Sequence, residues 1–266
     1  MPARHIPRPY APGVGSTPAV DPRVTVRVHG DLRDFLPARL RDVTVVRPID
    51  GRPGVKDVIE ALGIPHPEIG RVAVNGREVP LTQRVGPGDE IEVEALTLAA
   101  AAAFARPARF VLDGHLGRLA AYLRMAGFDT RYARDAGDDE LAAVSADEDR
   151  ILLTRDLGLL RRGIVRRGAF VRSDRPPVQL AEVLARFGLA DLVAPFGRCM
   201  RCNEPLEEAA PSDVVGLVPP RVLREQPDFR RCRACGGIYW RGSHHRRMER
   251  ILGEAIESAR ARITSA

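Results

Sequence analysis

The chain has 266 residues, of which 44% are hydrophobic and 29% are charged, and its formal net charge is +6. This length suffices for two or three packed units, and the composition excludes a disordered or fibrous chain. No apolar run approaches the roughly 20 residues of a membrane-spanning helix, and the N-terminal stretch lacks the apolar centre of a signal peptide. We therefore expect a cytoplasmic protein without a membrane partner.

The first two segments differ sharply in composition. Residues 1–22 are rich in proline, glycine and small residues, which predicts a disordered tail. Residues 23–97 have a ββαββ order, with a hairpin expected at Asn75 and Gly76. This order resembles the ubiquitin-like β-grasp fold, especially the small sulfur carriers of thiamine and molybdopterin synthesis. Those carriers act through a free C-terminal Gly-Gly, which residues 23–97 lack, so the resemblance implies the fold and not the activity.

Strands and helices alternate in the next part of the chain. Residues 98–107 form an alanine-rich linker that Pro107 ends. In residues 108–195, "RFVL", "TRYA", "RILLT" and "AFVRS" each precede a segment with helical periodicity. Four such units predict an α/β domain with a mainly parallel sheet and helices on both faces.

Acidic residues follow each predicted strand of this domain. Asp113 directly follows the first strand, Asp156 comes two residues after the third, and Asp174 directly follows the fourth. Asp138 and Asp139 open the helix after the second strand. Because parallel strands end at one edge of a sheet, we expect these carboxylates on one rim, where they would hold a catalytic Mg²⁺ or Mn²⁺. The alternative is that the helix-opening acids serve only as caps and first-turn charges.

Two Cys-x2-Cys pairs lie 29 residues apart in the C-terminal part, at Cys199, Cys202, Cys232 and Cys235. Thiols stay reduced in the cytoplasm, and four thiolates bind Zn²⁺ tetrahedrally. We therefore predict a zinc ribbon over residues 196–250 with a structural ion, followed by a C-terminal helix or tail over residues 251–266. Because four thiolates complete the ligand set, His244 and His245 are not expected to bind the metal.

The positive charge is concentrated in the same region. Residues 221–250 carry nine arginines and three acidic residues, which makes this stretch alone +6. Aromatic residues interleave with the arginines, a mixture that suits phosphates and stacked bases, although a solvated basic surface is the alternative. The predicted RNA contacts are Arg231, Arg233, Trp240, Arg241, Arg246 and Arg247.

The motifs together carry a second resemblance. The segments "FVLDGHLGRLAAYLRMAGFDT", "DDELAAV", "RILLTRD" and "VRSDRPPVQLAEVL", followed by the paired knuckles, resemble the Mut-seven C-terminal RNase family of PIN-like nucleases over about residues 108–250. Members with an N-terminal ubiquitin-like domain are known. The resemblance implies a metal-dependent ribonuclease whose acidic core is Asp113, Asp138 or Asp139, and Asp156, whereas Asp174 matches less closely.

Two functions follow from these features. We expect a metal-dependent ribonuclease that hydrolyses phosphodiester bonds of single-stranded RNA, with the β-grasp module available to a protein partner. The alternative is a non-catalytic RNA-binding or adaptor protein with a zinc ribbon and a purely structural acidic rim. Carboxylates gathered within one metal site favour the enzyme, and dispersed carboxylates favour the adaptor.

Overall fold

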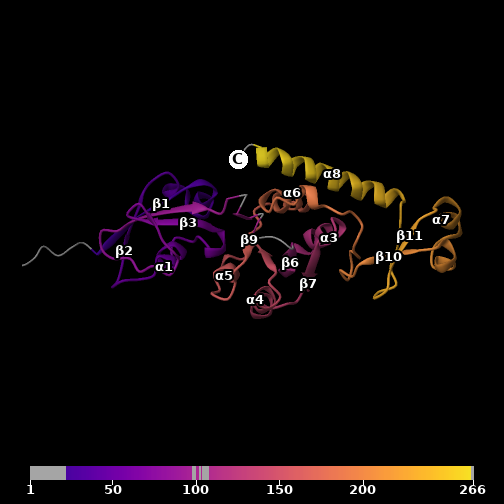
Figure 1. Ribbon diagram of the computed structural model, residues 1–266, viewed down its shortest axis with the longest axis horizontal. Coiled ribbons are helices and arrows are strands. Elements are labelled where there is room, and N and C mark those ends of the chain that lie inside the picture. The colour runs from indigo at the N-terminus through magenta and orange to yellow at the C-terminus, as the bar shows by residue number, and fades with distance from the viewer. Residues whose placement is uncertain (1–21, 98–99, 102, 104–107, 265–266) are drawn as a thin grey trace, which may run out of the picture.

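Three units follow one another along the molecule, and a long C-terminal helix runs back from the third unit along the second (Figure 1). The computed structural model describes residues 22–97, 100, 101, 103 and 108–264. The predicted tail, apart from its last residue, and most of the predicted linker lie outside the described residues.

The first unit is a five-stranded sheet in the order β2-β1-β5-β3-β4, in which β1 and β5 are parallel and the other neighbours are antiparallel. Its elements are β1 (Arg23–Val28), β2 (Val45–Pro48), α1 (Val55–Glu60), β3 (Ile69–Val74), β4 (Arg77–Glu78) and β5 (Glu90–Ala95). The predicted hairpin is present, because Asn75 and Gly76 adopt positive φ angles of 52° and 75° between β3 and β4. The predicted β-grasp fold is thereby confirmed.

The second unit is a four-stranded parallel sheet in the order β7-β6-β8-β9. Its elements are β6 (Arg109–Leu112), α3 (Gly117–Met125), β7 (Asp129–Tyr132), α4 (Asp138–Asp147), β8 (Ile151–Thr154), α5 (Leu157–Leu160), β9 (Gly168–Phe170) and α6 (Pro176–Arg186). The chain passes from β6 to β7 on one side and then crosses to β8 on the other side. The topological switch point, where ligands of open α/β sheets bind, therefore lies between β6 and β8.

Alternating side chains of the strands build two separate cores. Phe110 and Leu112 of β6 pack in a core with side chains of α3 and α6, whereas Val111 packs with side chains of α4 and α5. The strands read as continuous apolar runs because both faces of the sheet are covered. The predicted α/β architecture is confirmed.

The third unit is an antiparallel sheet in the order β10-β11-β12, placed at the far end of the molecule from the β-grasp unit (Figure 1). Its elements are β10 (Leu206–Ala209), α7 (Pro220–Glu225), β11 (Phe229–Cys232) and β12 (Ile238–Trp240). A small apolar cluster around Val214, Val218 and Phe229 lies beneath it. Such a small core cannot stabilise the ribbon by itself, which leaves a role for the cysteines.

The C-terminal helix α8 (Ser243–Thr264) corrects one predicted boundary. The ribbon was expected to extend to residue 250, but its last eight residues are the first two turns of α8. The buried residues Met248, Leu252, Ala255 and Ala259 share one face of the helix and join the core that α3 and α6 line. The many arginines on the other faces of α8 obscure this narrow stripe in the sequence.

The β-grasp unit contacts the edge of the second unit next to β9. The carboxylate of Glu68, only 1% exposed, accepts a hydrogen bond of 2.7 Å from the Phe170 amide and pairs with Arg186 at 2.8 Å. His66 Nε2 lies 2.7 Å from the Val165 carbonyl oxygen. These buried polar contacts fix the orientation of the two units, because breaking them leaves a buried charged group without a partner.

Replacing Glu68 by alanine leaves Arg186 without its buried partner, and the loss of such a partner costs about 3–5 kcal/mol. We expect the β-grasp unit to separate from β9 and the radius of gyration in small-angle X-ray scattering to increase. Glu78→Ala, which removes an exposed carboxylate that pairs with Arg71, is the matched control. A Glu68→Ala protein with the scattering curve of the wild type would contradict this role of the contact.

Candidate functional site

The carboxylate of Asp113 joins the ends of β6 and β8 at the switch point. Asp113 is 5% exposed. Its Oδ2 accepts hydrogen bonds from the Thr154 hydroxyl and, at 3.0 Å, from the Arg155 amide, and its Oδ1 accepts one of 2.8 Å from the His115 amide. Three donors compensate for the lost hydration of this carboxylate, so it can remain charged inside the fold.

Glycine at position 114 makes this geometry possible. A Cβ atom at Gly114 would lie 2.4 Å from the carbonyl oxygen of Arg134, in the segment that follows β7. The Tyr132 hydroxyl also donates a hydrogen bond of 3.0 Å to the Gly114 carbonyl. The loops that follow β6 and β7 therefore pack closely, and only a residue without a side chain fits between them.

The backbone amide of Asp156 and the carboxylate of Asp113 share one hydroxyl group. The Asp156 amide donates a hydrogen bond of 2.9 Å to the same Thr154 hydroxyl that donates to Asp113. Asp156 Oδ1 caps α5 by accepting from the amides of Gly158 at 2.6 Å and Leu159 at 3.2 Å. The capping role considered from the sequence is thus present. It uses one oxygen, and no described residue donates a hydrogen bond to the other.

The remaining predicted acids do not join this pair. Asp138 and Asp139 lie in the first turn of α4, and both pair with Arg162. The pair with Asp138 measures 3.8 Å, and the side chain of Asp139 is 93% exposed. Asp174 is exposed after β9. Among the described residues, only the cysteines form a group of three or more side chains whose ligand atoms all lie within 4.8 Å. The structure therefore connects Asp113 with Asp156 but does not gather Asp138, Asp139 and Asp174 around them.

Sequence reasoning missed two residues of this rim, Thr154 and Arg155. The Arg155 guanidinium donates hydrogen bonds of 2.8 Å and 2.6 Å to the carbonyls of Arg172 and Ser173, which holds the loop after β9 against the end of β8. A threonine at the end of an apolar strand, directly before a charged pair, was the available signal. Its importance depends on the strand order, which a local pattern does not reveal.

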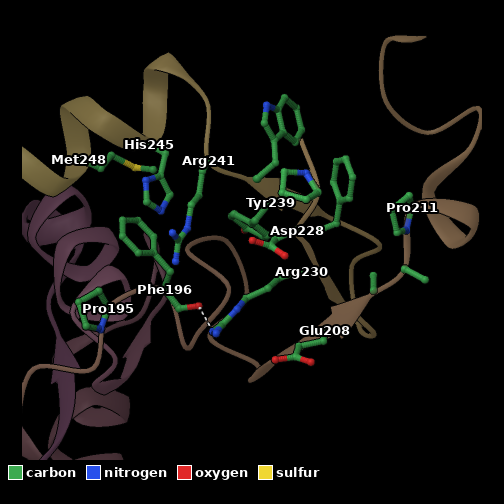
Figure 2. Close-up of a pocket in the computed structure, with 15 residues that line it drawn as sticks. Pro195, Phe196, Glu208, Pro211, Asp228, Arg230, Tyr239, Arg241, His245 and Met248 are labelled. Atoms are coloured by element: carbon green, nitrogen blue, oxygen red, sulfur yellow. Dashed lines mark hydrogen bonds between the residues drawn. The ribbon is translucent and has the colours of Figure 1, made fainter. Parts of the chain in front are cut away.

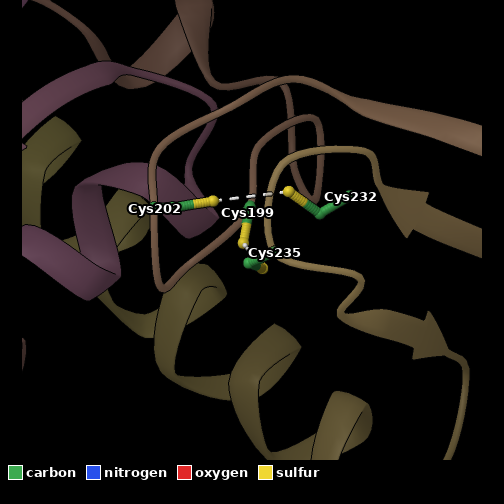
Figure 3. Close-up of side chains that lie close together, drawn as sticks. All are labelled: Cys199, Cys202, Cys232 and Cys235. Carbon is green, nitrogen blue, oxygen red and sulfur yellow. Dashed lines mark hydrogen bonds between the residues drawn. The ribbon is translucent and has the colours of Figure 1, made fainter.

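The four cysteines meet at one point beside the second unit (Figure 3). The Cys199 and Cys235 sulfurs lie 3.5 Å apart, and those of Cys202 and Cys232 lie 3.3 Å apart. A tetrahedral zinc ion with Zn–S bonds of about 2.3 Å places its sulfurs about 3.8 Å apart, so these two pairs of sulfurs need to move apart only slightly to accommodate it. The four cysteines predicted to bind zinc thus form one cluster of free thiols, which is consistent with a structural zinc site.

Ionisation of the thiols also favours a metal. Burial would raise the pKa of Cys199, but hydrogen bonds from the Tyr239 hydroxyl and nearby backbone groups lower it to about 6. Burial and hydrogen bonds with the neighbouring thiols raise the pKa of Cys202 to about 12. All four sulfurs cannot ionise together at neutral pH unless a cation offsets their repulsion, and a bound metal ion does so.

A buried arginine ties the first cysteine knuckle to the second unit. Arg124 of α3 donates to the carbonyls of Met200 at 3.1 Å and Arg201 at 2.8 Å, between the first two cysteines. Burial lowers the pKa of Arg124, and the thiols of Cys199 and Cys202 oppose that shift. A zinc ion with four thiolates carries a net charge of −2, so the guanidinium both shapes the knuckle and offsets its charge.

A second polar contact anchors the same knuckle. Asn203, in the left-handed region at φ 71°, accepts a hydrogen bond of 2.9 Å from the Thr130 amide and donates one of 2.7 Å to Asp129. Burial would raise the pKa of Asp129, but hydrogen bonds from Arg150 and Asn203 lower it below the usual range. The ribbon is therefore attached to edge strand β7 by two partly buried hydrogen bonds, one of which is made to a carboxylate.

The predicted RNA contacts lie on two sides of the ribbon. Trp240 and Arg241 line a cleft of about 620 Å³ between the ribbon and the start of α8, which Figure 2 shows. Arg247 lines a smaller neighbouring pocket. The other predicted contacts, all exposed, are Arg231, Arg233 and Arg246. Arg233 pairs with Glu207.

Arg124→Met should weaken metal binding although Arg124 is not a ligand, because groups that orient metal ligands typically contribute about 10- to 100-fold to affinity. Competition with a chromophoric zinc chelator measures this change, and the wild type should carry one zinc per chain. Arg201→Met, which removes an exposed arginine from the same knuckle, is the control. Equal zinc affinities of the two variants would contradict the assignment to Arg124.

Comparison with known proteins identifies both halves of the molecule. The family model of the Mut7-C RNAse domain matches residues 108–252, which is more than half of the chain, and the model of the Mut7-C ubiquitin domain matches residues 21–98. No curated protein and no solved structure matches the chain. Within the described residues, no helix is long and apolar enough to cross a membrane. The RNAse domain contains the acidic rim, and the ubiquitin-like domain precedes it in the sequence. The chain therefore belongs to the Mut7-C RNAse family, as the sequence motifs indicated.

Proposed function

We propose that the protein is a metal-dependent ribonuclease that hydrolyses RNA phosphodiester bonds at the rim formed by Asp113 and Asp156. One observation carries the proposal: the buried Asp113 carboxylate and the backbone amide of Asp156 bind the same Thr154 hydroxyl at the switch point of a parallel sheet. Open α/β sheets bind their ligands at this point. The match to the RNAse family supports the same reading.

The free acceptor positions at the rim suit a hard divalent cation. Asp113 Oδ1 accepts a hydrogen bond from the His115 amide and lies 3.4 Å from Nδ1 of the exposed His115 ring, and Asp156 Oδ2 accepts no hydrogen bond from the described residues. Mg²⁺ is commonly held by one or two carboxylates, substrate phosphates and water, and Mn²⁺ prefers the same oxygen ligands. When bound, such an ion supplies an activated water and offsets the charge of the scissile phosphate.

The protein's own groups keep this rim in place. Thr154 and the Arg155 amide fix the direction of the Asp113 carboxylate, while the Arg155 side chain holds the loop that carries Asp174. We retain Asp138, Asp139 and Asp174 as further acids of the site. For Asp138 and Asp139 to act, Arg162 must exchange its carboxylate partners for another anion, and the phosphates of RNA provide one.

The other units are assigned supporting roles. Zinc in the four-cysteine cluster is structural, because four protein ligands leave no open position for a substrate. The exposed arginines of the ribbon and α8 bind the RNA backbone, and the reduced thiols suit a cytoplasmic location. The β-grasp unit, docked beside β9, is the surface on which we propose that a protein partner binds.

An adaptor function is the second candidate, and one observation favours it. Asp138 and Asp139 pair with Arg162, so the structure does not collect three carboxylates at one metal site. A protein that binds RNA without cleaving it needs no such site. Purified wild-type protein that binds single-stranded RNA but leaves it intact with Mg²⁺ and with Mn²⁺ would establish the adaptor.

Asp156→Asn is the sharpest test of the catalytic proposal. Asparagine caps a helix as well as aspartate does, so α5 should remain intact while one charge is lost. Loss of a metal-binding carboxylate should remove several kcal/mol of transition-state stabilisation. Single-turnover cleavage should therefore slow by roughly 100-fold or more, whereas RNA affinity should persist.

Asp57→Asn makes the matched change at an exposed acid that caps α1, far from the rim in the sequence. It should cleave RNA like the wild type. Asp113→Asn is less clean, because an amide cannot accept all three hydrogen bonds that Asp113 accepts. An Asp156→Asn protein that cleaves at the wild-type rate with saturating Mn²⁺ would exclude Asp156 from catalysis.

A further inference from the structure

The cleft between the ribbon and α8 has the size and the walls of a ligand site. Its volume of about 620 Å³ lies within the roughly 300–1,000 Å³ typical of small-molecule sites. Residues from four parts of the chain line it: the segment before the first knuckle, the end of β10 with the residues after it, strands β11 and β12 with their flanking residues, and the first turns of α8. Neither Asp113 nor Asp156 lines it, and of its aromatic residues only Tyr239 hydrogen-bonds a cysteine of the cluster within the described part of the chain.

Aromatic rings form one wall of the cleft. The Phe196 and His245 rings stack with their centroids 3.9 Å apart and an interplanar angle of 26°. Trp240 and Tyr239, both half-buried, also line the cleft. Flat aromatic groups that remain partly accessible offer surfaces on which a planar ligand can stack.

Phe196 is held in an unusual conformation at this wall. Its φ of 57° lies in the left-handed region, which bulky residues rarely adopt. The Phe196 amide donates a hydrogen bond of 2.8 Å to Met125, and its carbonyl accepts one of 2.9 Å from Arg230. Backbone strain that the surroundings maintain is concentrated at binding sites, so the position of this ring points to a ligand.

The charges of the cleft distinguish among ligands. In the view of Figure 2, the Arg241 guanidinium and the Asp228 carboxylate both point into the space between α8 and the ribbon strands. Neither side chain makes an ion pair or hydrogen bond with another described residue. Arg230 and Glu208 also line the cleft, so both cations and anions are present on its walls, which suits a ligand that carries both a phosphate and hydrogen-bond donors.

A second pocket adjoins the cleft and is bordered by α3. This pocket of about 230 Å³ shares Met248 with the cleft and is lined by His244 and Arg247 of α8 and by Arg118 of α3. Arg118 lies in the first turn of α3, five residues after Asp113. Basic side chains therefore follow one another from the cleft to the end of β6.

We propose that the cleft holds one unstacked base of a single RNA strand, whose phosphates follow Arg241, Arg247 and Arg118 toward the Asp113 rim. The proposal rests on the proposed function and names its substrate-binding subsite. A base inside a duplex cannot reach an aromatic wall, so the cleft selects single strands. An acidic peptide would satisfy the arginines, but Asp228 would repel it.

Asp228 adds a preference among bases. A carboxylate accepts hydrogen bonds from the exocyclic amino groups of bases, which uracil lacks. Guanine presents an amino group beside a ring N–H, so both carboxylate oxygens find a donor. The cleft should therefore prefer guanine to uracil.

The single tryptophan of the chain makes the site directly observable, because Trp240 lines the cleft. A ten-nucleotide uridine oligomer with one central guanosine, added without Mg²⁺ or Mn²⁺, should quench the fluorescence of the full-length protein. Fluorescence anisotropy of the labelled oligomer measures affinity independently, and a gel verifies that the oligomer stays intact. Neither reading depends on cleavage.

Three variants and one control separate the contributions. Trp240→Leu should weaken anisotropy-detected binding by roughly 5- to 150-fold, as expected for one lost stacking surface. Arg241→Gln should weaken the binding of all RNA sequences and lower by about one the magnitude of the slope of log affinity against log salt concentration. Arg221→Gln makes the same charge change outside the cleft and should have neither effect. Asp228→Asn should abolish the preference for the guanosine-containing oligomer over plain oligouridine.

Other results would overturn the proposal. Anisotropy-detected binding without tryptophan quenching, and equal to wild type in Trp240→Leu, would locate the RNA elsewhere and leave the ribonuclease proposal intact. Quenching by oligoglutamate as strong as that by RNA at equal salt would identify a peptide site. Absence of any RNA binding would also reject the cleft, and cleavage of RNA with Mn²⁺ then decides separately whether the protein is a nuclease.

Discussion

The charge of Asp113 is the constraint on which the second unit depends. A carboxylate that leaves water loses several kcal/mol of hydration unless donors replace it, and here the donors come from β8 as well as from the segment after β6. Those donors are in place only if β6 and β8 are neighbours. The strand order, the close packing at Gly114 and the position of Asp156 follow from satisfying this one group. The resulting site is rigid before any ligand arrives, as catalysis by preorganised groups requires.

Buried charges also determine how the units are held together. Arg124 attaches the first cysteine knuckle to α3, and Glu68 attaches the β-grasp unit to β9 and α6. Each contact brings a charged side chain to backbone groups of a neighbouring unit, which fixes orientation as well as distance. The apolar stripe of α8 then joins the same core as α3 and α6. The rim and the basic cleft consequently belong to one molecule-long scaffold and not to independently moving domains.

The sequence predicted the features that local patterns encode. Alternation, the Asn75–Gly76 turn and the spacing of Cys199 and Cys202 predicted the β-grasp sheet, the hairpin and the metal cluster, because each depends on neighbouring residues. The start of α8 was missed because its buried face consists of only four small or apolar residues, and arginines lie around them in the sequence. The pairing of Asp139 with Arg162 was missed because it joins the first turn of α4 to the segment after α5, and the proximity of these two parts depends on tertiary packing. Phe196 gave no signal either, for its conformation is imposed by contacts with Met125 and Arg230.

The central claim is that Asp113 and Asp156 form a divalent-metal site at the switch point. Anomalous diffraction from crystals of the intact protein soaked in Mn²⁺ tests it most directly, because manganese is located without reference to activity. The account predicts a manganese peak within coordination distance of the Asp113 and Asp156 carboxylates, and a separate zinc peak among the four cysteines. Well-ordered Asp113 and Asp156 side chains without manganese between them, in a crystal whose zinc site is filled, would contradict it.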